Sequence, residues 1–398
     1  MVRQTLDPWG SDAVKDYSRL TQEFGIEPVL PLIPRFRRPS HHLSRGIDFG
    51  QRDLSRVLDA IDGNKPYAVM SGIKPTGDYH LGTKMTADDI IYFQSLSKKA
   101  TAYYAIADVE AYSDNGISFK DSAKIAVRHV ADILALGLDR DRAVVYFQSQ
   151  EIRVMRLSSI FSRGVTNNML KAIYGERQIG LYMAALVQAG DILMPQLPEF
   201  GGPKPVLVPV GADQDPHLRL ARDLAAKYQR DFRFIPPASI YHRLMLSMTG
   251  DQKMSKRAEG SLLTLSDPPS LASKKVLSAF TGGRDTVDEQ RRLGGRADIC
   301  PVFELYKFHF ALNDEHVERV YSECTTGTRL CGECKHEARP CQEFLIKPSK
   351  EARFVNARRQ GALRKKCEVP SICREVGATN VNTTPSNREE GSCCASPR

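Results

Sequence analysis

Short apolar stretches alternate with amphipathic ones along the first two thirds of the chain. Five apolar stretches have the length and composition of buried strands: residues 67–70, 101–106, 143–147, 206–210 and 231–235. Between them, apolar residues recur every three or four positions, the spacing that gathers them on one face of a helix. This pattern predicts helices over residues 86–97, 117–138, 181–193 and 216–228. Because strands alternate with helices, the fold class is predicted to be α/β with a mostly parallel sheet.

The pattern changes outside this region, and the changes predict domain boundaries. Residues 1–66 are polar and contain prolines, with one helical stretch at residues 52–61, so we expect an N-terminal extension. The α/β domain is expected to cover residues 67–265, and its segment at about 112–205 holds helices of its own and is interpreted as an insertion. Residues 266–365 predict an α-helical second domain, with helical patterns at 270–280, 287–293, 302–310 and 314–324. Residues 366–398 are poor in large apolar side chains and are predicted to be disordered.

Composition adds two constraints. The chain has 398 residues, enough for two domains with cores of their own. It contains no apolar run that approaches a membrane span and no apolar signal region, so we expect a cytoplasmic protein without a membrane partner. The formal net charge of +9 is ordinary for a globular protein, but it also suits a polyanionic partner such as a nucleic acid.

A turn rich in glycine joins the first predicted strand to the helix that follows. It spans residues 71–83 and has the sequence SGIKPTGDYHLGT. In α/β proteins this position presents a helix N-terminus, which binds phosphate groups. The turn is not a Walker A loop, because Asp78 stands where that motif requires lysine.

A second candidate loop lies at residues 253–257, where the sequence is KMSKR between Gly250 and Gly260. Two lysine ammonium groups on a glycine-flanked loop can close over a phosphate chain and stabilise the charge that builds up as pyrophosphate leaves. Short runs of lysine and serine are also common on protein surfaces. The loop therefore gains its meaning only beside the upstream turn.

Together the two loops resemble the signatures of class I aminoacyl-tRNA synthetases. Residues 80–83 (HLGT) resemble the HIGH signature, and residues 253–257 resemble the KMSKS loop, in the order of that class. Residues 206–216 (VLVPVGADQDP), 7–9 (DPW) and 281–284 (TGGR) are similar to tryptophanyl-tRNA synthetases of the archaeal and eukaryotic-like branch. The resemblance covers roughly residues 5 to 336. It implies a Rossmann-like parallel-sheet catalytic domain followed by an α-helical anticodon-binding domain.

The resemblance also implies a reaction in two steps. ATP, with Mg²⁺, converts L-tryptophan into tryptophanyl-adenylate and pyrophosphate, and the amino acid is then transferred to tRNA(Trp). The implied catalytic residues, which act on the phosphates, are His80, Lys253 and Lys256. The implied ATP-binding residues are Gly72, Lys74, Thr76, Gly82, Thr83, Gly211, Asp213, Met254 and Ser255.

The implied tryptophan-binding residues are Glu110, Gln188, Asp191 and Gln214. The indole N–H requires an acceptor inside an apolar slot. In the bacterial branch an aspartate that matches Asp191 meets the indole nitrogen, whereas the eukaryotic-like branch uses glutamines that match Gln188 and Gln214. The chain holds both sets, so both stay open. Met70 and Ala105 stand where the eukaryotic-like branch has a pocket tyrosine and a glutamine, which favours Asp191.

Four of the nine cysteines form a pattern typical of a metal site: Cys300, Cys324, Cys331 and Cys334. Such thiolates in a cytoplasmic protein suit Zn²⁺ or an iron–sulfur cluster better than disulfides. Some tryptophanyl-tRNA synthetases carry a [4Fe–4S] cluster on a very similar spacing, so the resemblance implies such a cluster. A zinc ion, or four thiols without a ligand, are the alternatives.

Two other functions stay open from the sequence. Tyrosine also carries a hydrogen-bond donor, so a tyrosine-specific synthetase is the nearest rival, and residues 213–216 (DQDP) argue against it. The other is a paralogue that binds tRNA or RNA without charging it. Such a protein has no need of both loop lysines or of Asp213, so their presence favours the enzyme. By resemblance, the insertion is also expected to form the dimer surface of a homodimer.

Overall fold

The computed structural model describes residues 6–10, 17, 24–250, 253–254, 261–311 and 313–338. All of them belong to one compact unit. Two of the predicted site residues, Ser255 and Lys256, lie outside the described residues, as does the tail at residues 366–398.

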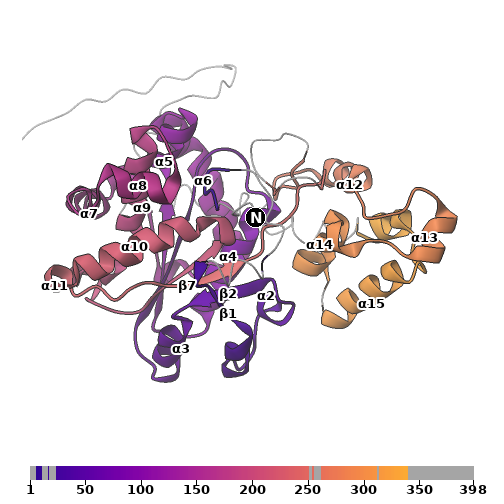
Figure 1. Cartoon of the computed structure of the whole chain (residues 1–398), viewed down its shortest axis with the longest axis horizontal. Helices are drawn as coiled ribbons and strands as arrows, with labels where there is room; N and C mark the ends of the chain where they lie inside the picture. Colours follow the sequence, from indigo (N-terminus) through magenta and orange to yellow (C-terminus); the bar gives the residue numbers. More distant parts are fainter. Residues whose placement is uncertain are drawn as a thin grey trace, which may run out of the picture. The chain divides into compact units, whose positions relative to one another are not determined.

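The centre of the fold is a single sheet, which has seven strands within the described residues, in the order β1-β2-β7-β6-β3-β4-β5. Figure 1 labels β1, β2 and β7, which are neighbours in this order. Their bounds are β1 (Glu27–Pro28), β2 (Asp48–Arg52), β3 (Tyr67–Ile73), β4 (Ala100–Ile106), β5 (Ala143–Phe147), β6 (Val206–Gly211) and β7 (Ala238–His242). Strands β3 to β7 pair in parallel, and β2 and β1 extend the β7 edge in antiparallel pairing. The prediction of an α/β fold with a mostly parallel sheet is therefore confirmed. Strand β5 lies within the segment interpreted as an insertion, and it forms one edge of the sheet.

One predicted strand, at residues 231–235, is wrong. These residues include the end of helix α11 (Gln229–Phe232), which stops where Arg233 takes the left-handed conformation with φ 57°. The aromatic residues that suggested a strand instead stack on each other, with the Phe232 and Phe234 ring centroids 4.9 Å apart. The strand that enters the sheet is β7, which begins only after two prolines.

Ten α-helices of the described residues lie between β1 and β7 in the chain. They are α2 (His41–Ser44), α3 (Leu54–Asp62), α4 (Leu81–Ser95), α5 (Asp108–Asn115), α6 (Phe119–Leu136), α7 (Ile152–Ser162), α8 (Asn167–Tyr174), α9 (Ile179–Leu193), α10 (Asp215–Lys227) and α11. Short 3-10 helices connect them: η1 (Leu30–Arg35), η2 (Arg140–Arg142), η3 (Gln148–Gln150), η4 (Met194–Gln196), η5 (Pro198–Phe200) and η6 (Ala212–Gln214). The predicted helix at 117–138 is confirmed as α6, which Ser118 caps at the N-terminus and Gly137, at φ 118°, ends.

Two helices set the position of the site. Helix α4 follows β3 directly and packs against β3, β4 and β6. Helix α9 is buried along most of its length, and it contacts β3 and β6. Both helices have apolar side chains on the side that packs on the sheet. Burial of these side chains is the main contribution that holds the helices there.

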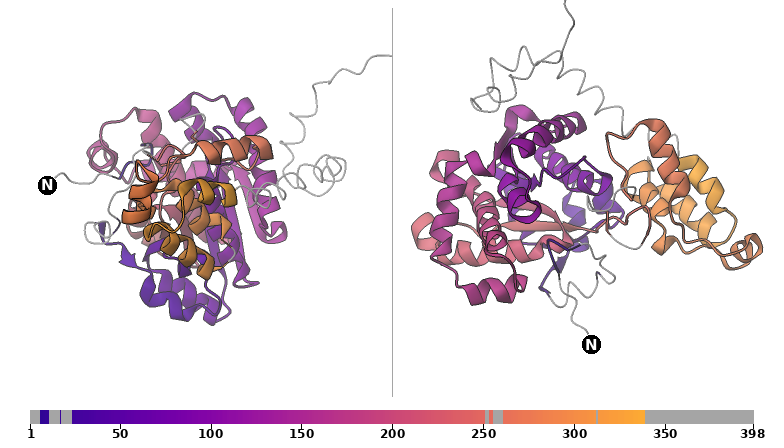
Figure 2. Two further views of the ribbon diagram at one scale, coloured as in Figure 1. Left: turned by 90° about the vertical axis from the view of Figure 1, so that its right-hand side faces the viewer. Right: turned by 90° about the horizontal axis from the view of Figure 1, so that it is seen from above.

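No further strand follows β7 in the described residues up to position 338. The chain there forms α12 (Pro269–Ser278), α13 (Val287–Leu293), η7 (Ala297–Ile299), α14 (Pro301–Leu305), a π-helix η8 (Tyr306–Phe310) and α15 (Asp314–Thr325). Figure 2 shows these helices in orange and yellow, gathered into a group of their own. The helical character predicted for this part of the chain is confirmed over those ranges. None of the described helices combines the length and the apolar character needed to cross a membrane.

Candidate active site

A cavity of about 370 Å³ opens at the carboxyl ends of the central parallel strands. Strand β3 lies between β4, which follows it in the chain, and β6, which comes later. The order of the strands therefore changes direction at β3, the place where open α/β sheets bind ligands. Every predicted ATP-binding, tryptophan-binding and catalytic residue that the structure describes lines this cavity: Gly72, Lys74, Thr76, His80, Gly82, Thr83, Glu110, Gln188, Asp191, Gly211, Asp213, Gln214, Lys253 and Met254.

His80 is the N-cap of α4, and its ring folds back onto the first turn of the helix. Its Nδ1 accepts a hydrogen bond from the Thr83 backbone N–H at 3.2 Å, and its Nε2 lies 3.0 Å from Thr83 Oγ1. Because Nδ1 accepts, a neutral imidazole carries its proton on Nε2, which is then a donor. A side chain at Gly82 would lie 3.2 Å from His80 Nδ1, so glycine keeps room for the ring.

Lys74 and Glu110 form a charged wall of the cavity, the first basic and the second acidic. Lys74 Nζ lies 2.5 Å from Asp114 Oδ2 and 3.3 Å from Glu110 Oε1. Glu110 Oε1 also accepts a hydrogen bond from the indole Nε1 of Trp9 at 3.1 Å. The predicted substrate-binding carboxylate is therefore already engaged by two donors of the chain.

Asp213 and Lys253 come together as an ion pair across the cavity. Both side chains are mostly buried, so the pair is shielded from solvent. Lys253 also forms an isolated β-bridge with Leu246, which places the start of the predicted loop beside the segment that follows β7. A side chain at Gly211 would lie 2.7 Å from Asp213 Oδ1, so a residue larger than glycine would displace the carboxylate.

Asp191 is the most buried acidic residue of the cavity, with 1% of its surface exposed. Its carboxylate accepts hydrogen bonds from Tyr146 Oη at 2.9 Å and from Gln148 Nε2 at 2.6 Å. Burial raises the pKa of Asp191 to about 7, although these two donors counteract it. A carboxylate has about four acceptor positions, so positions remain for a further donor. Gln188 lies one turn before Asp191 on α9 and lines the same cavity.

Sequence reasoning missed two contributors to this cavity. Trp9, the only tryptophan of the chain, packs against Tyr174 and His217, with ring centroids 5.2 and 5.3 Å away. Gln148 orients Asp191 from the 3-10 helix after β5. Trp9 belongs to a motif that was recognised only as a resemblance. No motif marks Gln148, because its contact with Asp191 depends on where β5 ends in the folded chain.

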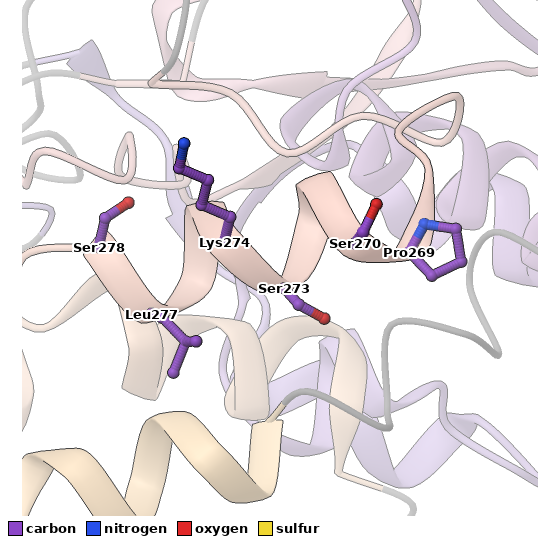
Figure 3. Close-up of a pocket in the computed structure, with 6 residues that line it drawn as sticks. All are labelled: Pro269, Ser270, Ser273, Lys274, Leu277 and Ser278. Atoms are coloured by element: carbon purple, nitrogen blue, oxygen red, sulfur yellow. The ribbon is translucent and has the colours of Figure 1, made fainter.

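A second hollow, of about 690 Å³, lies along α12 and is drawn in Figure 3. Its lining consists of residues of this one helix: Pro269, Ser270, Ser273, Lys274, Leu277 and Ser278. No predicted site residue is among them. The hollow is an open helix surface rather than an enclosed site, so its larger volume carries no functional weight.

The four predicted metal-binding cysteines line one small cavity in the helical part of the chain. All four are free thiols, and Cys300 is buried. Side chains at Gly283 and Gly295 would lie 2.8 Å from the sulfurs of Cys331 and Cys324, so glycines leave room around the sulfur atoms. Burial, together with the neighbouring thiols, raises the pKa of Cys324 to about 11 and that of Cys334 to about 12.

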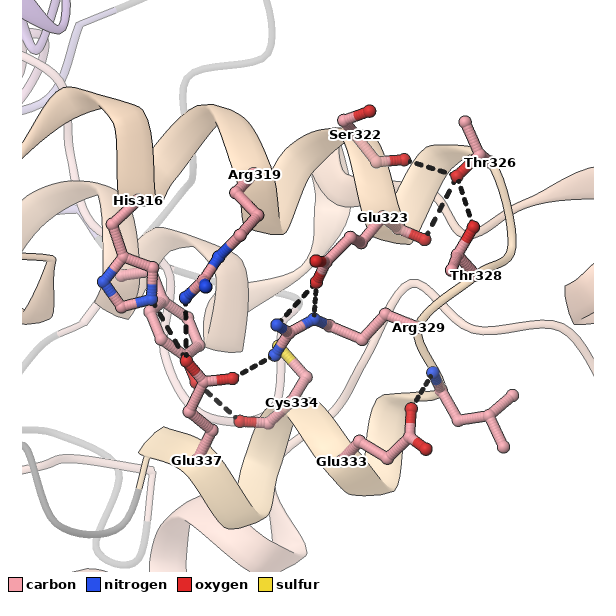
Figure 4. Close-up of polar contacts among 12 residues, drawn as sticks. His316, Arg319, Ser322, Glu323, Thr326, Thr328, Arg329, Glu333, Cys334 and Glu337 are labelled. Atoms are coloured by element: carbon pink, nitrogen blue, oxygen red, sulfur yellow. Dashed lines mark hydrogen bonds and ion pairs between the residues drawn. The ribbon is translucent and has the colours of Figure 1, made fainter.

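An ion-pair network borders this cysteine cavity, and Figure 4 shows it. Arg329 lines the cavity and donates to Glu323 Oε2 from Nε at 2.7 Å, and it also pairs with Glu337. His316 Nε2 lies 3.1 Å from Glu337 Oε1. The network joins α15 to the helical residues 331–338, which carry the Cys-x2-Cys pair.

Comparisons with known proteins agree with this arrangement. The sequence profile of a family described as tRNA synthetases class I (W and Y) matches residues 62–343. The chain is 43% identical to a tryptophan–tRNA ligase of Aeropyrum pernix, over 85% of this chain and 92% of that protein. It is 40% identical to a tryptophan–tRNA ligase of Archaeoglobus fulgidus, over 86% of this chain and 96% of that protein.

The fold has a solved counterpart. The crystal structure of a tryptophanyl-tRNA synthetase from Aeropyrum pernix matches the structure with a TM-score of 0.80 at 41% sequence identity. The match covers 87% of this chain and 95% of that chain. The similarity therefore extends over the sheet and the helical part together.

Proposed function

The chain belongs to the tryptophan and tyrosine branch of the class I tRNA synthetases, and we propose that it is a tryptophan–tRNA ligase. It attaches tryptophan to tRNA(Trp) at the expense of ATP, through a tryptophanyl-adenylate. The observation that carries this proposal is the single cavity at β3. In it, two phosphate-binding signatures meet a buried acceptor for the indole N–H.

In the first step the tryptophan carboxylate attacks the α-phosphorus of ATP, and the bond to pyrophosphate breaks. Mg²⁺ that accompanies ATP would compensate the negative charge of the phosphates. His80 is suited to donate from Nε2, because its Nδ1 is already an acceptor. Catalysis then requires position and charge rather than an enzyme nucleophile.

Lys253 and Lys256 are proposed to close over the leaving phosphates. Lys253 is paired with Asp213. When ATP binds, the ribose hydroxyls replace the lysine as partners of Asp213, and Lys253 becomes available to phosphate. The ion pair thus holds both groups inside the cavity.

In the second step the 2′-hydroxyl of the terminal adenosine of the tRNA attacks the carbonyl carbon of the adenylate, and AMP leaves. Neither step needs a covalent bond to the protein. The described residues of the cavity need only hold the adenylate in place and keep its charge compensated.

Selection of tryptophan is proposed to depend on Asp191. It is the acidic group deepest in the cavity, and Tyr146 and Gln148 fix the plane of its carboxylate. Gln188 and Gln214 line the same cavity and are the alternative acceptors. A site built around a buried acceptor discriminates strongly against analogues that lack the matching donor.

Residues 266–365 are proposed to bind the anticodon of the tRNA. The described part of this range is helical, and the net charge of +9 favours a polyanionic partner. Residues 67–265 are then the catalytic domain, and residues 1–66 are an extension whose Trp9 reaches its cavity.

The cysteine cavity is proposed to hold an iron–sulfur cluster, with Zn²⁺ as the alternative. Four thiols line one cavity, and two glycines leave room for the sulfur atoms. A zinc ion needs sulfurs about 3.8 Å apart. Among the described residues, no three of these cysteines have their sulfur atoms within 4.8 Å of one another. Zinc binding would therefore require the sulfurs to move closer together. The cavity itself is only about 20 Å³, so an iron–sulfur cluster would require the side chains to turn outward.

The bound group would connect α15 with residues 331–338, because Cys324 belongs to the first and the Cys-x2-Cys pair to the second. Metal binding must displace the thiol protons, whose pKa values burial raises. Its contribution is structural: it fixes two helical segments of the proposed tRNA-binding domain.

A homodimer in the cytoplasm is proposed as the working form. Helices α7, α8 and α9 of the insertion carry exposed apolar side chains: Ile152, Ile160, Met169, Ile179 and Met183. Light scattering of the purified protein tests the dimer. A monomer at micromolar concentration would contradict it.

The direct test of the function is aminoacylation of tRNA(Trp) transcript with radiolabelled tryptophan. The expected result is ATP-dependent formation of tryptophanyl-tRNA. Binding of the tRNA without any charging would instead identify a non-charging paralogue.

A further inference from the structure

A group of three buried ionisable side chains lies outside the cavity and has no role in the account so far. His42 comes from α2, Asp48 from β2 and Asp89 from α4, and each is only 1% exposed. One ligand atom of each side chain lies within 4.8 Å of the others. We call this group the buried His–Asp–Asp cluster.

The cluster is short of hydrogen-bond donors. His42 Nδ1 lies 2.6 Å from Asp89 Oδ1. Three further carboxylate oxygens of the cluster are buried and have no hydrogen-bond partner: both oxygens of Asp48 and Oδ2 of Asp89. His42 Nε2 also has no hydrogen-bond partner, but it faces Asp88 on the other side of the ring. A buried carboxylate without partners is unfavourable unless a proton or a cation neutralises it.

The charge of the cluster depends on what the two carboxylates hold. Two ionised carboxylates and one protonated imidazole leave one negative charge, which either a proton on one carboxylate or a bound cation would neutralise. Lys84 is held by Asp88 at 2.5 Å, and Asp88 Oδ2 lies 3.9 Å from His42 Nε2 on the other side of the ring.

We propose that His42, Asp48 and Asp89 bind one divalent transition-metal cation, with Zn²⁺ as the ion that suits the donors. One imidazole nitrogen and two carboxylates form a donor set typical of Zn²⁺. Mg²⁺ prefers an all-oxygen, hydrated site and is disfavoured in a buried cluster with an imidazole. A neutral imidazole with two carboxylates compensates the charge of the ion. Both oxygens of Asp48 are free, so this residue can supply two of four ligand atoms.

The ion would act as a structural link rather than in the reaction. It joins α2 and β2 of the N-terminal segment to α4, the helix that His80 caps. None of the three ligands lines the cavity at β3. His41, the neighbour of His42, reaches in the other direction, with Nε2 3.0 Å from the backbone oxygen of Phe308. The link therefore ties the middle of α4, at Asp89, to α2 and β2.

The first test is the metal content of the full chain, purified in the presence of Zn²⁺ and dialysed. The wild type should carry about one zinc ion more per chain than Asp48→Asn, measured by inductively coupled plasma mass spectrometry. Metal bound by the cysteines is the same in both proteins and cancels in the difference. Asp88→Asn is the matched control, because Asp88 faces the opposite side of the His42 ring.

The second test is thermal stability, and its sign separates a metal from a shared proton. With Zn²⁺ the melting temperature of the wild type should rise with the logarithm of the ion concentration, and that of Asp48→Asn should rise less. After chelation the order should reverse, because Asn removes one buried carboxylate that has no partner. Asp89→Asn serves the same purpose if Asp48→Asn does not fold.

Two results would overturn the proposal. Equal zinc content in the wild type and in Asp48→Asn, with no difference in the Zn²⁺-dependent melting temperature, would mean that the cluster shares protons only. Loss of zinc in Asp88→Asn but not in Asp48→Asn would place the ion on the other face of His42, with His41 and Asp88.

Discussion

Replacement of Asp191 by asparagine separates two effects of this side chain, because it keeps the shape and removes the charge. Asp191 is buried, and its pKa is raised from 3.8 to about 7. A carboxyl group whose pKa is raised on folding stabilises the folded state at low pH. This contribution is lost as the pH rises from the pKa of the unfolded state through the pKa of the folded state. For Asp191 this window runs from about pH 4 to about pH 7, and it amounts to about 4 kcal/mol at about 1.4 kcal/mol per unit.

The hydrogen bonds of the variant can largely re-form. Tyr146 Oη can still donate to the remaining oxygen of asparagine. Gln148 has a buried Oε1 without a partner, so a flip of its amide would place that oxygen toward the new Nδ2. The free energy of unfolding of Asp191→Asn should therefore rise relative to the wild type as pH increases from 4 to 7, and stay level above 7. Urea unfolding at several pH values measures this difference.

The same variant should bind tryptophan more weakly. Loss of a hydrogen bond to a charged acceptor costs about 1.5–3 kcal/mol, which is a roughly 10- to 150-fold rise in the KM for tryptophan. The KM for ATP should not change. In the wild type the KM for tryptophan should also rise below about pH 7, where Asp191 takes up its proton, and this dependence should be absent in the variant.

ATP–pyrophosphate exchange at varied tryptophan concentration and pH measures these constants, with Gln188→Leu as the comparison. An unchanged KM for tryptophan in Asp191→Asn, together with a large rise in Gln188→Leu, would refute the assignment. The glutamines would then be the acceptors of the indole N–H.

Three further changes test other parts of the structure. Lys253→Ala removes the partner of Asp213 and should slow pyrophosphate exchange about 100-fold or more, with tryptophan binding retained. The exposed control Lys99→Ala should behave as wild type. Equal rates in the two variants would show that Lys253 does not act on the phosphates. Cys331→Ser should abolish visible absorption at about 400 nm and lower the melting temperature of anaerobically purified protein, and a colourless, metal-free but stable wild type would contradict the cluster. Glu304→Gln keeps an acceptor for the Leu246 N–H but removes a carboxyl group whose pKa burial raises to about 7. The variant should therefore gain stability relative to the wild type as pH rises from about 4.5 to 7. Parallel pH profiles of the two proteins in urea unfolding would contradict this.

The sequence was sufficient where local pattern and long-range pairing agree. Strands β3, β4 and β6 are apolar runs that stay buried in the sheet, and β5 is an apolar run at its edge that is only partly buried. The positions of all four were predicted correctly. The same holds for the turn after β3, because glycine and His80 act within a few residues of one another. Fourteen predicted site residues line one cavity because each follows a strand of the same parallel sheet or packs over it.

The sequence failed where a segment is stabilised by distant partners. Strand β2 contains Asp48 and Gly50, which have low strand propensity, and it forms because β7 pairs with it. The apparent strand at 231–235 has the right alternation, but its aromatic rings pack on each other and the sheet receives the residues after two prolines. The role of Trp9 was equally hidden, since Glu110 lies about a hundred positions later in the chain.

ATP–pyrophosphate exchange with each amino acid in turn measures whether this chain activates tryptophan. Exchange with tryptophan should be at least about 100-fold faster than with tyrosine or any other amino acid. Exchange driven by tyrosine would contradict the specificity assigned to the cavity, and no exchange with any amino acid would contradict the enzyme itself.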